Sequence, residues 1–324
     1  MKVLVTGGAG YIGSHLVDRL MARGDVVYVV DNLSTGKIQN IQHLLGKEGL
    51  HFTNDSILDE TLLDRIVERV DLIYHLAAVV GVKYVIEDPL HGIYTNVKGT
   101  ENVLSSAYKY WKKILIASSS EIYGKSRDIP FRENGDRILG PTDVSRWSYS
   151  MSKAIDEHFA FAYYDKGLPV SIVRYFNSYG PRLDEKGYGS VVARFIQEAL
   201  SGQPITVYGD GSQSRCFTYI DDTIEGTILV GEVKEAEGKA FNIAHESETT
   251  ILELAHLIRE QTHSPSKIQF VPYRSIYGEQ FEDTPRRVPS IEAAQRTLGF
   301  KPKVPLIEGL QRTVAWWKEK YNRR

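Results

Sequence analysis

A tyrosine and a lysine four residues apart are the part of this sequence that most directly suggests chemistry. They lie in the segment Trp147-Ser148-Tyr149-Ser150-Met151-Ser152-Lys153. Four residues make about one helical turn, so a helix would hold the phenol of Tyr149 and the ammonium of Lys153 on one face. The positive charge would lower the pKa of the phenol and make it a usable base near neutral pH. With a serine run just upstream, the pattern indicates redox chemistry on a hydroxyl group.

A glycine-rich turn near the N-terminus indicates where a dinucleotide would bind. Three glycines are spaced Gly-x-x-Gly-x-x-Gly between an apolar strand at 2–6 and a helical pattern at 11–20. The first two permit a tight turn and the close approach of a diphosphate, and the third lets the helix pack near the strand. The amides at the helix N-terminus would face the anion. The cofactor-binding residues predicted in this turn are Gly7, Gly10, Tyr11, Ile12 and Gly13.

An aspartate after the second predicted strand indicates which dinucleotide binds. Asp31 follows the strand at 26–30, where a carboxylate accepts hydrogen bonds from an adenosine ribose and repels a 2′-phosphate. NAD is therefore favoured over NADP, although Asp31 could instead cap a turn. Asp55 could accept from the adenine amino group or simply form a turn. The other predicted cofactor-binding residues are Asn32, Ser56, Leu76, Ala77, Ala78, Asn96, Tyr149, Lys153 and Tyr175.

The elements that would position these residues alternate along the chain. Apolar runs that predict buried parallel strands lie at 2–6, 26–30, 72–76, 113–117 and 170–175, and helix-like stretches at 61–69, 93–110 and 148–164. This alternation predicts a Rossmann-like, doubly wound α/β sheet at 1–180 that binds NAD. Residues 181–324 are expected to form mainly a smaller α/β lobe for the substrate. A strand at 241–244 could return to the first sheet, and a last helix is expected at 306–321.

Composition excludes several other classes of function. The 324 residues carry 39 basic and 41 acidic side chains, so no long-range field favours nucleic acid or an anionic membrane as a partner. No apolar run approaches the ~18 residues of a membrane span, and the nine histidines show no metal-ligand pattern. The single cysteine, Cys216, excludes an internal disulfide and, without an apolar leader, points to the cytoplasm. We expect a soluble enzyme without a protein-bound metal.

Several of these segments together resemble the extended short-chain dehydrogenases that modify nucleotide sugars. They are residues 6–13, 75–78, Asn96, the serine run 118–120, 149–153 and 174–182. Within that superfamily, residues 118–124, 140–149 and 277–290 are most similar to the UDP-glucuronate decarboxylases. These include the decarboxylase domain of the bacterial aminoarabinose pathway and the plant UDP-apiose/UDP-xylose synthases.

The resemblance implies roles for individual residues. Ser119 matches the catalytic Ser/Thr, Tyr149 the base, and Lys153 the residue that binds nicotinamide ribose. Glu121 and Arg287 match the acidic and basic residues that decarboxylases add, although Arg286 could take the place of Arg287. A UDP-sugar substrate and a homodimer formed through a four-helix bundle of 93–110 and 148–164 are also implied. The substrate-binding residues expected are Ser120, Asn177, Arg182, Val207, Tyr208, Arg215, Tyr277 and Arg287.

The expected reaction begins when Tyr149 removes the proton of a sugar C4 hydroxyl while C4 gives its hydride to NAD+. If C5 bears a carboxylate, the 4-keto sugar is a β-keto acid and loses CO2 easily, which would convert UDP-glucuronate to a UDP-pentose. Glu121 facing that carboxylate requires protonation, a water or a cation between them. A structural salt bridge is its alternative role. The rival functions are a UDP-glucose or UDP-glucuronate 4-epimerase, then a 4,6-dehydratase, then a non-catalytic NAD or sugar-nucleotide sensor.

Overall fold

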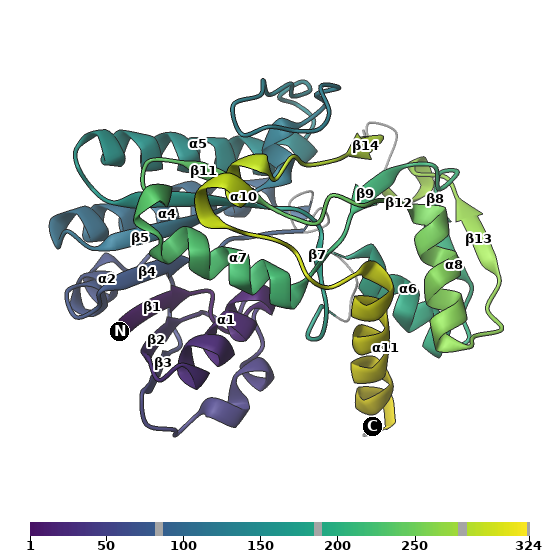
Figure 1. The fold of residues 1–324 in the computed structure, drawn as a ribbon, viewed down its shortest axis with the longest axis horizontal. Helices are drawn as coiled ribbons and strands as arrows, with labels where there is room; N and C mark the ends of the chain where they lie inside the picture. The colour runs from purple at the N-terminus through teal and green to yellow at the C-terminus, as the bar shows by residue number, and fades with distance from the viewer. Residues whose placement is uncertain (82–86, 185–189, 278–283, 323–324) are drawn as a thin grey trace.

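A seven-stranded parallel sheet forms the centre of the protein (Figure 1). The computed structural model describes residues 1–81, 87–184, 190–277 and 284–322. The strand order β11-β6-β5-β4-β1-β2-β3 reverses direction between β1 and β4, as in a Rossmann fold, and confirms the predicted architecture. The strands are β1 (Lys2–Thr6), β2 (Val26–Val30), β3 (Leu50–Thr53), β4 (Leu72–His75), β5 (Lys113–Ser119), β6 (Val170–Tyr175) and β11 (Ala240–Ile243). β11 lies beside β6, so the later segment does return to this sheet.

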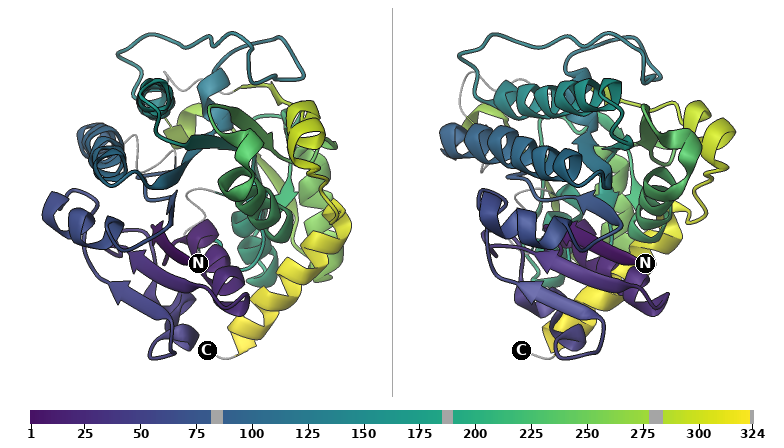
Figure 2. Two further views of the ribbon diagram at one scale, coloured as in Figure 1. Left: turned by 60° about the vertical axis from the view of Figure 1, so that its left-hand side comes forward. Right: turned by 90° about the vertical axis from the view of Figure 1, so that its left-hand side faces the viewer.

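Helices cover both faces of the sheet (Figure 2). One face carries α1 (Tyr11–Ala22) and α7 (Ile220–Glu232), and the other carries α2 (Glu60–Val67), α4 (Pro89–Lys109) and α5 (Arg146–Asp165). α4 begins four residues before the predicted helix, because the side chain of Asp88 accepts a hydrogen bond from the amide of His91 and Pro89 opens the first turn. The pairing of α4 with α5 places the segment around Tyr149 over the ends of the strands.

The alternation of side chains along each strand explains how the sheet buries both of its faces. In β1, Val3 and Val5 belong to the apolar core that also contains Leu16 of α1, whereas Leu4 belongs to a second core with Leu63 of α2. All these side chains are fully buried. A nearly continuous run of apolar residues is therefore what a strand covered on both faces needs.

The second half of the chain builds most of a smaller lobe, on the right of Figure 1. Its strands are β7 (Ser178–Tyr179), β8 (Ile205–Tyr208), β9 (Ser214–Cys216), β10 (Thr218–Tyr219), β12 (Glu248–Thr250), β13 (Ile268–Val271) and β14 (Arg286–Arg287). Its helices are α6 (Val191–Leu200), α8 (Ile251–Thr262), α9 (Arg274–Tyr277) and α11 (Leu306–Asn322), whereas α10 (Glu292–Leu298) packs beside β11 of the central sheet. The described residues also form four short 3-10 helices, η1 (Ile38–Asn40), η2 (Gln42–Leu44), η3 (Ser120–Tyr123) and η4 (Lys234–Ala236).

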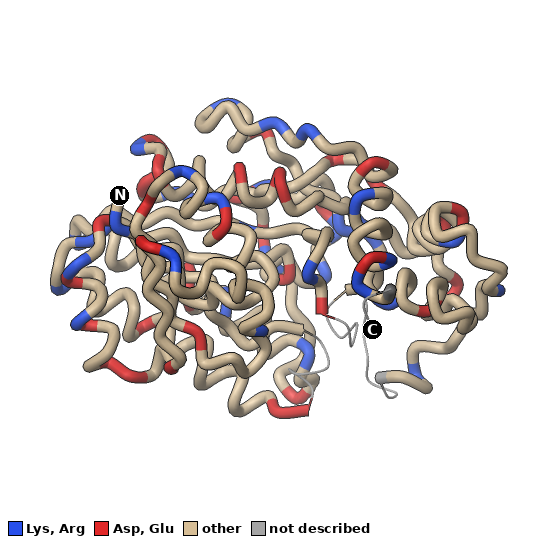
Figure 3. Tube along the Cα trace, turned by 90° about the horizontal axis from the view of Figure 1, so that it is seen from below, with Lys and Arg blue, Asp and Glu red and all other residues tan. Residues whose placement is uncertain are grey.

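The remaining features of the fold are two packed tryptophans, one buried cysteine and a surface of mixed charge. Trp317 of α11 is buried and packs edge-on against Trp316, and Cys216 is a buried free thiol. Basic and acidic residues alternate over the view in Figure 3, without a broad region of one sign. None of the helices in the described ranges is long and apolar enough to cross a membrane.

Candidate active site

A cavity of about 950 Å³ opens where the carboxyl ends of the central strands meet the smaller lobe. In a doubly wound sheet, ligands bind at this edge, next to the point where the strand order reverses. Most of the predicted site residues line the cavity. From the sheet side they are Gly7, Gly10, Tyr11, Ile12, Gly13, Asp31, Asn32, Asp55, Ser56, Leu76, Ala77, Ala78, Ser119, Ser120, Glu121, Tyr149, Lys153, Tyr175 and Asn177. From the smaller lobe they are Tyr208, Arg215 and Arg287.

The turn after β1 has the shape of a diphosphate cradle. Gly7 adopts φ +71°, and a Cβ there would lie 2.8 Å from the backbone nitrogen of Ala77. A Cβ on Gly13 would lie 2.1 Å from the carbonyl oxygen of Gly7, so only glycine lets α1 start this close to the strand. No side chain caps the N-terminus of α1 at Gly10. The backbone of this turn therefore fits the anionic diphosphate of a dinucleotide.

Two carboxylates line the cavity where the sequence predicts the adenosine, Asp31 and Asp55. Asp31 accepts hydrogen bonds from the amides of Ala9, at 2.9 Å, and Leu33, at 2.8 Å, and burial raises its pKa. It therefore shapes the turn, as its alternative role predicted, while it also lines the cavity. Asp55 accepts a hydrogen bond from the amide of Ser56 at 2.7 Å. Both aspartates therefore stabilise a turn and also line the cavity.

The predicted base and its partners converge at the middle of the cavity. β5 continues to Ser119, and α5 carries Tyr149 and Lys153 on the face toward it. Burial raises the pKa of Tyr149 above its ordinary value of 10.0, and this effect is larger than the lowering by the Lys153 charge and the Ser119 hydrogen bond. The charge of Lys153 thus lowers the pKa of Tyr149, as predicted, while burial raises that pKa by more, because the phenol is enclosed by protein. The Nζ of Lys153 lies 3.0 Å from Asp156.

Glu121 lies in a cluster of arginines beside this group. Its Oε1 is 2.9 Å from Nη1 of Arg287, and its Oε2 is 3.5 Å from Nη2 of Arg146. Burial alone would raise the pKa of Glu121, but the charges of Arg287, Arg146 and Arg215 lower it from 4.5 to about 2. Glu121 is therefore ionised at neutral pH, and cations rather than a proton offset its charge.

The structure also decides between the two neighbouring arginines of β14. Arg287 is buried and turns toward Glu121, whereas Arg286 points outward and forms an exposed ion pair with Glu248 at 2.6 Å. Successive side chains of a strand point to opposite sides, so only one of the two can face the cavity. Arg287 is that residue.

Three predicted site residues do not line the cavity. Asn96 is buried, and its side-chain oxygen accepts from the amide of Val79 at 2.8 Å, so it holds the loop after β4. Arg182 pairs with Asp18 of α1 at 2.6 Å. The side chain of Val207 is fully buried in the core. The side chain of a fourth, Tyr277, lies outside the described residues, as do the adjoining residues 278–283.

Two further arginines, Arg146 and Arg194, line the cavity, although neither was predicted as a site residue. Arg146 precedes Tyr149 by three residues, a spacing that places both on one face of α5 and that could have revealed it. Arg194 of α6 lines the substrate side, with its guanidinium carbon 3.7 Å from the ring centroid of Tyr208. Arg194 and Tyr208 belong to different elements, so this stacked pair forms only in the tertiary structure. The spacing of the two residues in the sequence does not predict it.

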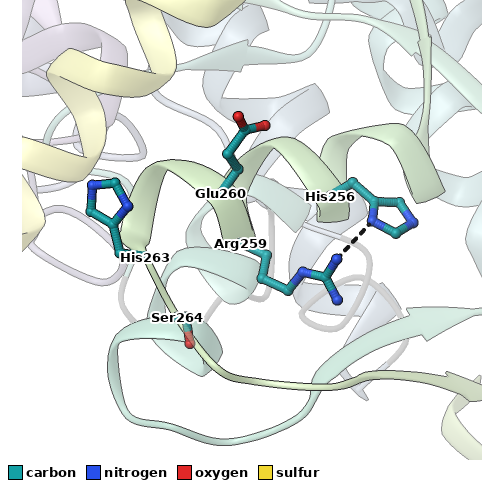
Figure 4. A pocket seen from close by; sticks show the side chains of 5 residues that line it. All are labelled: His256, Arg259, Glu260, His263 and Ser264. Carbon is teal, nitrogen blue, oxygen red and sulfur yellow. Dashed lines mark hydrogen bonds between the residues drawn. The ribbon is translucent and has the colours of Figure 1, made fainter.

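A second hollow lies on the outer surface of α8, at its C-terminal end (Figure 4). Arg259 donates a hydrogen bond to Nδ1 of His256 at 3.3 Å, while Glu260 and His263 point away from this pair. The histidines are exposed and do not converge. Among the described residues, no group of three His, Cys, Asp or Glu side chains could hold a metal ion. The large cavity is therefore the candidate active site.

Comparison with known proteins finds relatives over nearly the whole chain. A sequence profile of the family described as GDP-mannose 4,6 dehydratase matches residues 4–313. A UDP-N-acetyl-alpha-D-glucosaminuronate decarboxylase of Bacillus cytotoxicus is 43% identical over 98% of both chains. UDP-glucuronic acid decarboxylase 1 of Danio rerio is 37% identical over 98% of this chain and 72% of its own. The crystal structure of Thermus thermophilus UDP-glucose 4-epimerase with NAD matches with a TM-score of 0.85 at 32% identity, covering 98% of this chain and 99% of that one.

Proposed function

The chain belongs to the GDP-mannose 4,6-dehydratase family of NAD-dependent epimerases and dehydratases, and from that premise we propose that it decarboxylates a UDP-hexuronate. The observation that carries the proposal is the cluster around Glu121. Two buried arginines, Arg146 and Arg287, contact this carboxylate beside Tyr149. Both also line the cavity, where guanidinium groups can bind a ligand anion through charge-assisted hydrogen bonds. The C5 carboxylate of a hexuronate is such an anion, and a neutral hexose has none.

The cofactor follows from the family and from the shape of the turn. The cradle at Gly7 and Gly13 suits a diphosphate, and Asp31 stands where it would accept from a ribose and repel a 2′-phosphate. When bound, NAD accepts the hydride of the sugar C4 and later returns it. Lys153 at the cavity wall would bind the nicotinamide ribose.

The side chains then divide the work of the reaction. Tyr149 takes the proton of the C4 hydroxyl, and Ser119, to which it is hydrogen-bonded, orients that hydroxyl. The charge of Lys153 stabilises the phenolate that Tyr149 must form. Arg287 and Arg146 hold the C5 carboxylate, which leaves as CO2 because the C4 ketone accepts the electron pair of the broken bond. The enolate that forms takes a proton from water at C5, and Tyr149 gives its proton back to the C4 oxygen when the hydride returns to C4. Glu121 is ionised and holds the two arginines in place instead of supplying a proton.

The nucleotide end of the substrate is assigned to the smaller lobe. Arg215 is buried at the cavity wall and binds the diphosphate, and Tyr208, covered on one face by Arg194, packs against the base. Ser120 and Asn177 line the sugar region between the lobes. The identity of the base as uracil is supported by the UDP-sugar names of the relatives at 43% and 37% identity.

A second sugar is favoured by a specific observation. The relative at 43% identity is named for the N-acetylated hexuronate, whereas the relative at 37% is named for UDP-glucuronate. We therefore place UDP-N-acetylglucosaminuronate beside UDP-glucuronate as a substrate. A 4-epimerase ranks below both, because the relatives at 43% and 37% identity are named decarboxylases.

The test is proton NMR of the purified protein with NAD+ and each of the two UDP-hexuronates. A UDP-pentose with release of CO2 is the expected product, and the Tyr149→Phe variant should produce almost none while it still binds NAD. A product that keeps all its carbons and is inverted at C4 would replace decarboxylation with epimerisation.

We further infer a homodimer in a reducing compartment such as the cytoplasm. α4 and α5 lie side by side on the outer face of the sheet (Figure 2). Their surface exposes Leu90 at 76%, Ile93 at 42% and Tyr94 at 57% on α4, with Met151 at 44% on α5. Apolar side chains gathered on paired helices favour association with the same pair of a second copy, as a four-helix bundle. The single cysteine favours the reducing compartment.

A further inference from the structure

A buried carboxylate contacts the lysine beside the base. Asp156 follows Lys153 on the same face of α5, and its Oδ2 lies 3.0 Å from the Nζ of Lys153. The two side chains are 0% and 3% exposed. Each of these buried charges offsets part of the cost of burying the other. The charge that acts on Tyr149 is therefore that of an ion pair, not of a free ammonium.

The other ionisable groups around this pair are already engaged or neutral. Glu157, next on α5, accepts from Arg174 of β6 at 2.7 Å. His75 of β4 is buried between two threonine hydroxyls, and burial lowers its pKa from 6.5 to about 3, so it is neutral. Glu121 of η3 acts on Tyr149 from the other side and is held by arginines. Among the described residues, Asp156 is the carboxylate that forms an ion pair with Lys153.

We propose that Asp156 is a positioning residue for the base. As the buried counter-ion of Lys153 it fixes where the ammonium lies, and it sets the pH range over which Tyr149 and Lys153 work together. The proposal rests on the roles given above to Tyr149 and Lys153, and no part of it requires a particular sugar.

The direction in which Asp156 moves the pKa values of Tyr149 and Lys153 follows from its negative charge. Asp156 raises the pKa of Tyr149, in the same direction as burial, and it raises the pKa of Lys153 against burial. Removing its negative charge lowers the pKa of both groups, because each deprotonation becomes easier. Since the two groups interact, the titration of the pair as a whole moves to lower pH.

The experiment is an ultraviolet titration of tyrosinate in the NAD-loaded, full-length protein. The signal of Tyr149 is isolated by subtracting the Tyr149→Phe spectrum from that of the protein with Tyr149 intact. In the Asp156→Asn background the midpoint should fall by about one pH unit. An unchanged or higher midpoint would overturn the proposal. Asp165→Asn, an exposed change at the end of the same helix, should leave the midpoint unchanged.

Two further measurements separate positioning from a purely structural role. Both limbs of the pH profile of turnover should move toward acid in Asp156→Asn, whereas a structural role would lower the rate without moving them. The amide oxygen of asparagine still accepts from Nζ, so calorimetry should give an NAD affinity within about twofold of the natural protein. Asp156→Ser, which loses that contact, should bind NAD several-fold more weakly; equal affinity in both variants would remove the positioning role. If Asp156→Asn does not fold by circular dichroism, Asp156→Ser carries the same titration.

The titration is independent of the proposed function. It uses NAD alone, so a failure to turn over either UDP-hexuronate leaves its result intact. Conversely, if the protein forms a UDP-pentose but Asp156→Asn does not move the Tyr149 midpoint, the proposed decarboxylase function stands and the positioning role of Asp156 is rejected.

Discussion

At the scale of single residues, the ionisation state of Glu121 limits the role that this side chain can have in the reaction. Arg287 and Arg146 keep Glu121 ionised, with a pKa of about 2, so it does not supply a proton at neutral pH. Under the proposed function, its contribution is to hold two cations at the distance where a substrate carboxylate can join them. An uncharged side chain at this position would remove the carboxylate that both arginines contact.

The Glu121→Gln variant tests this reading. We expect C4 oxidation to continue while CO2 release falls by about 100-fold, because the arginines no longer hold the substrate carboxylate in place. Reduced NAD should then accumulate and be seen by its absorbance, with NAD affinity unchanged. Glu48→Gln, an exposed change, is the matched control. Full CO2 release in Glu121→Gln would remove Glu121 from the mechanism.

The same residue predicts a pH dependence of stability. A pKa lowered from 4.5 to about 2 means that Glu121 stabilises the fold above pH 4.5 and that this contribution is lost as the pH falls toward 2. Acid unfolding followed by circular dichroism should therefore be less steep in Glu121→Gln than in the natural protein. Identical curves would show that the arginines do not stabilise the ionised form.

At the scale of elements, the junction of β1 with α1 depends on the absence of one side chain. Gly13→Ala would place a methyl group 2.1 Å from the carbonyl oxygen of Gly7 and push α1 away from the strand. We expect NAD affinity, measured by calorimetry, to fall at least about tenfold. Gly92→Ala is the control, since its Cβ would meet only Val79 at 3.9 Å. Undiminished affinity in Gly13→Ala would contradict the assignment of the cradle.

A buried ion pair ties together the three elements that carry the base. Arg174 of β6 binds Glu157 of α5 through two hydrogen bonds, and Ser118 of β5 donates to the same carboxylate. Removing one partner leaves a buried charge unpaired, so Glu157→Gln should lower the free energy of unfolding by about 3 kcal/mol. Chemical denaturation measures this. The exposed pair of Arg132 and Glu292 gives the control, because Glu292→Gln should leave stability unchanged.

At the scale of the whole molecule, two regions and a second copy are expected to act together. Tyr149 comes from the sheet side of the cavity, whereas Arg287 and Arg215 come from the small sheet of β12, β9 and β14. α5, which carries Tyr149, is also half of the proposed dimer surface, so association would steady the helix that holds the base.

Light scattering after size exclusion tests the dimer. The 36.6 kDa chain should elute with about twice that mass. Combined Ile93→Lys and Tyr94→Lys substitutions should give the monomer, because they place charge on the exposed apolar face of α4. Ile276→Lys, which changes an equally exposed apolar residue of the other lobe, should not. If the unmodified protein elutes with the mass of a monomer, the prediction of a four-helix interface is wrong.

The sequence by itself determined the sheet, the glycine turn and the spacing of Tyr149 and Lys153, because each depends on periodicity or on residues a few positions apart. Only the tertiary structure selected Arg287 over Arg286, placed Arg146 and Arg194 at the cavity, and moved Asn96, Arg182 and Val207 away from it. These outcomes depend on which strands and helices meet, and on burial, which outweighs the effect of Lys153 on the pKa of Tyr149. Local spacing contains neither kind of information, since both arise from segments far apart in the chain.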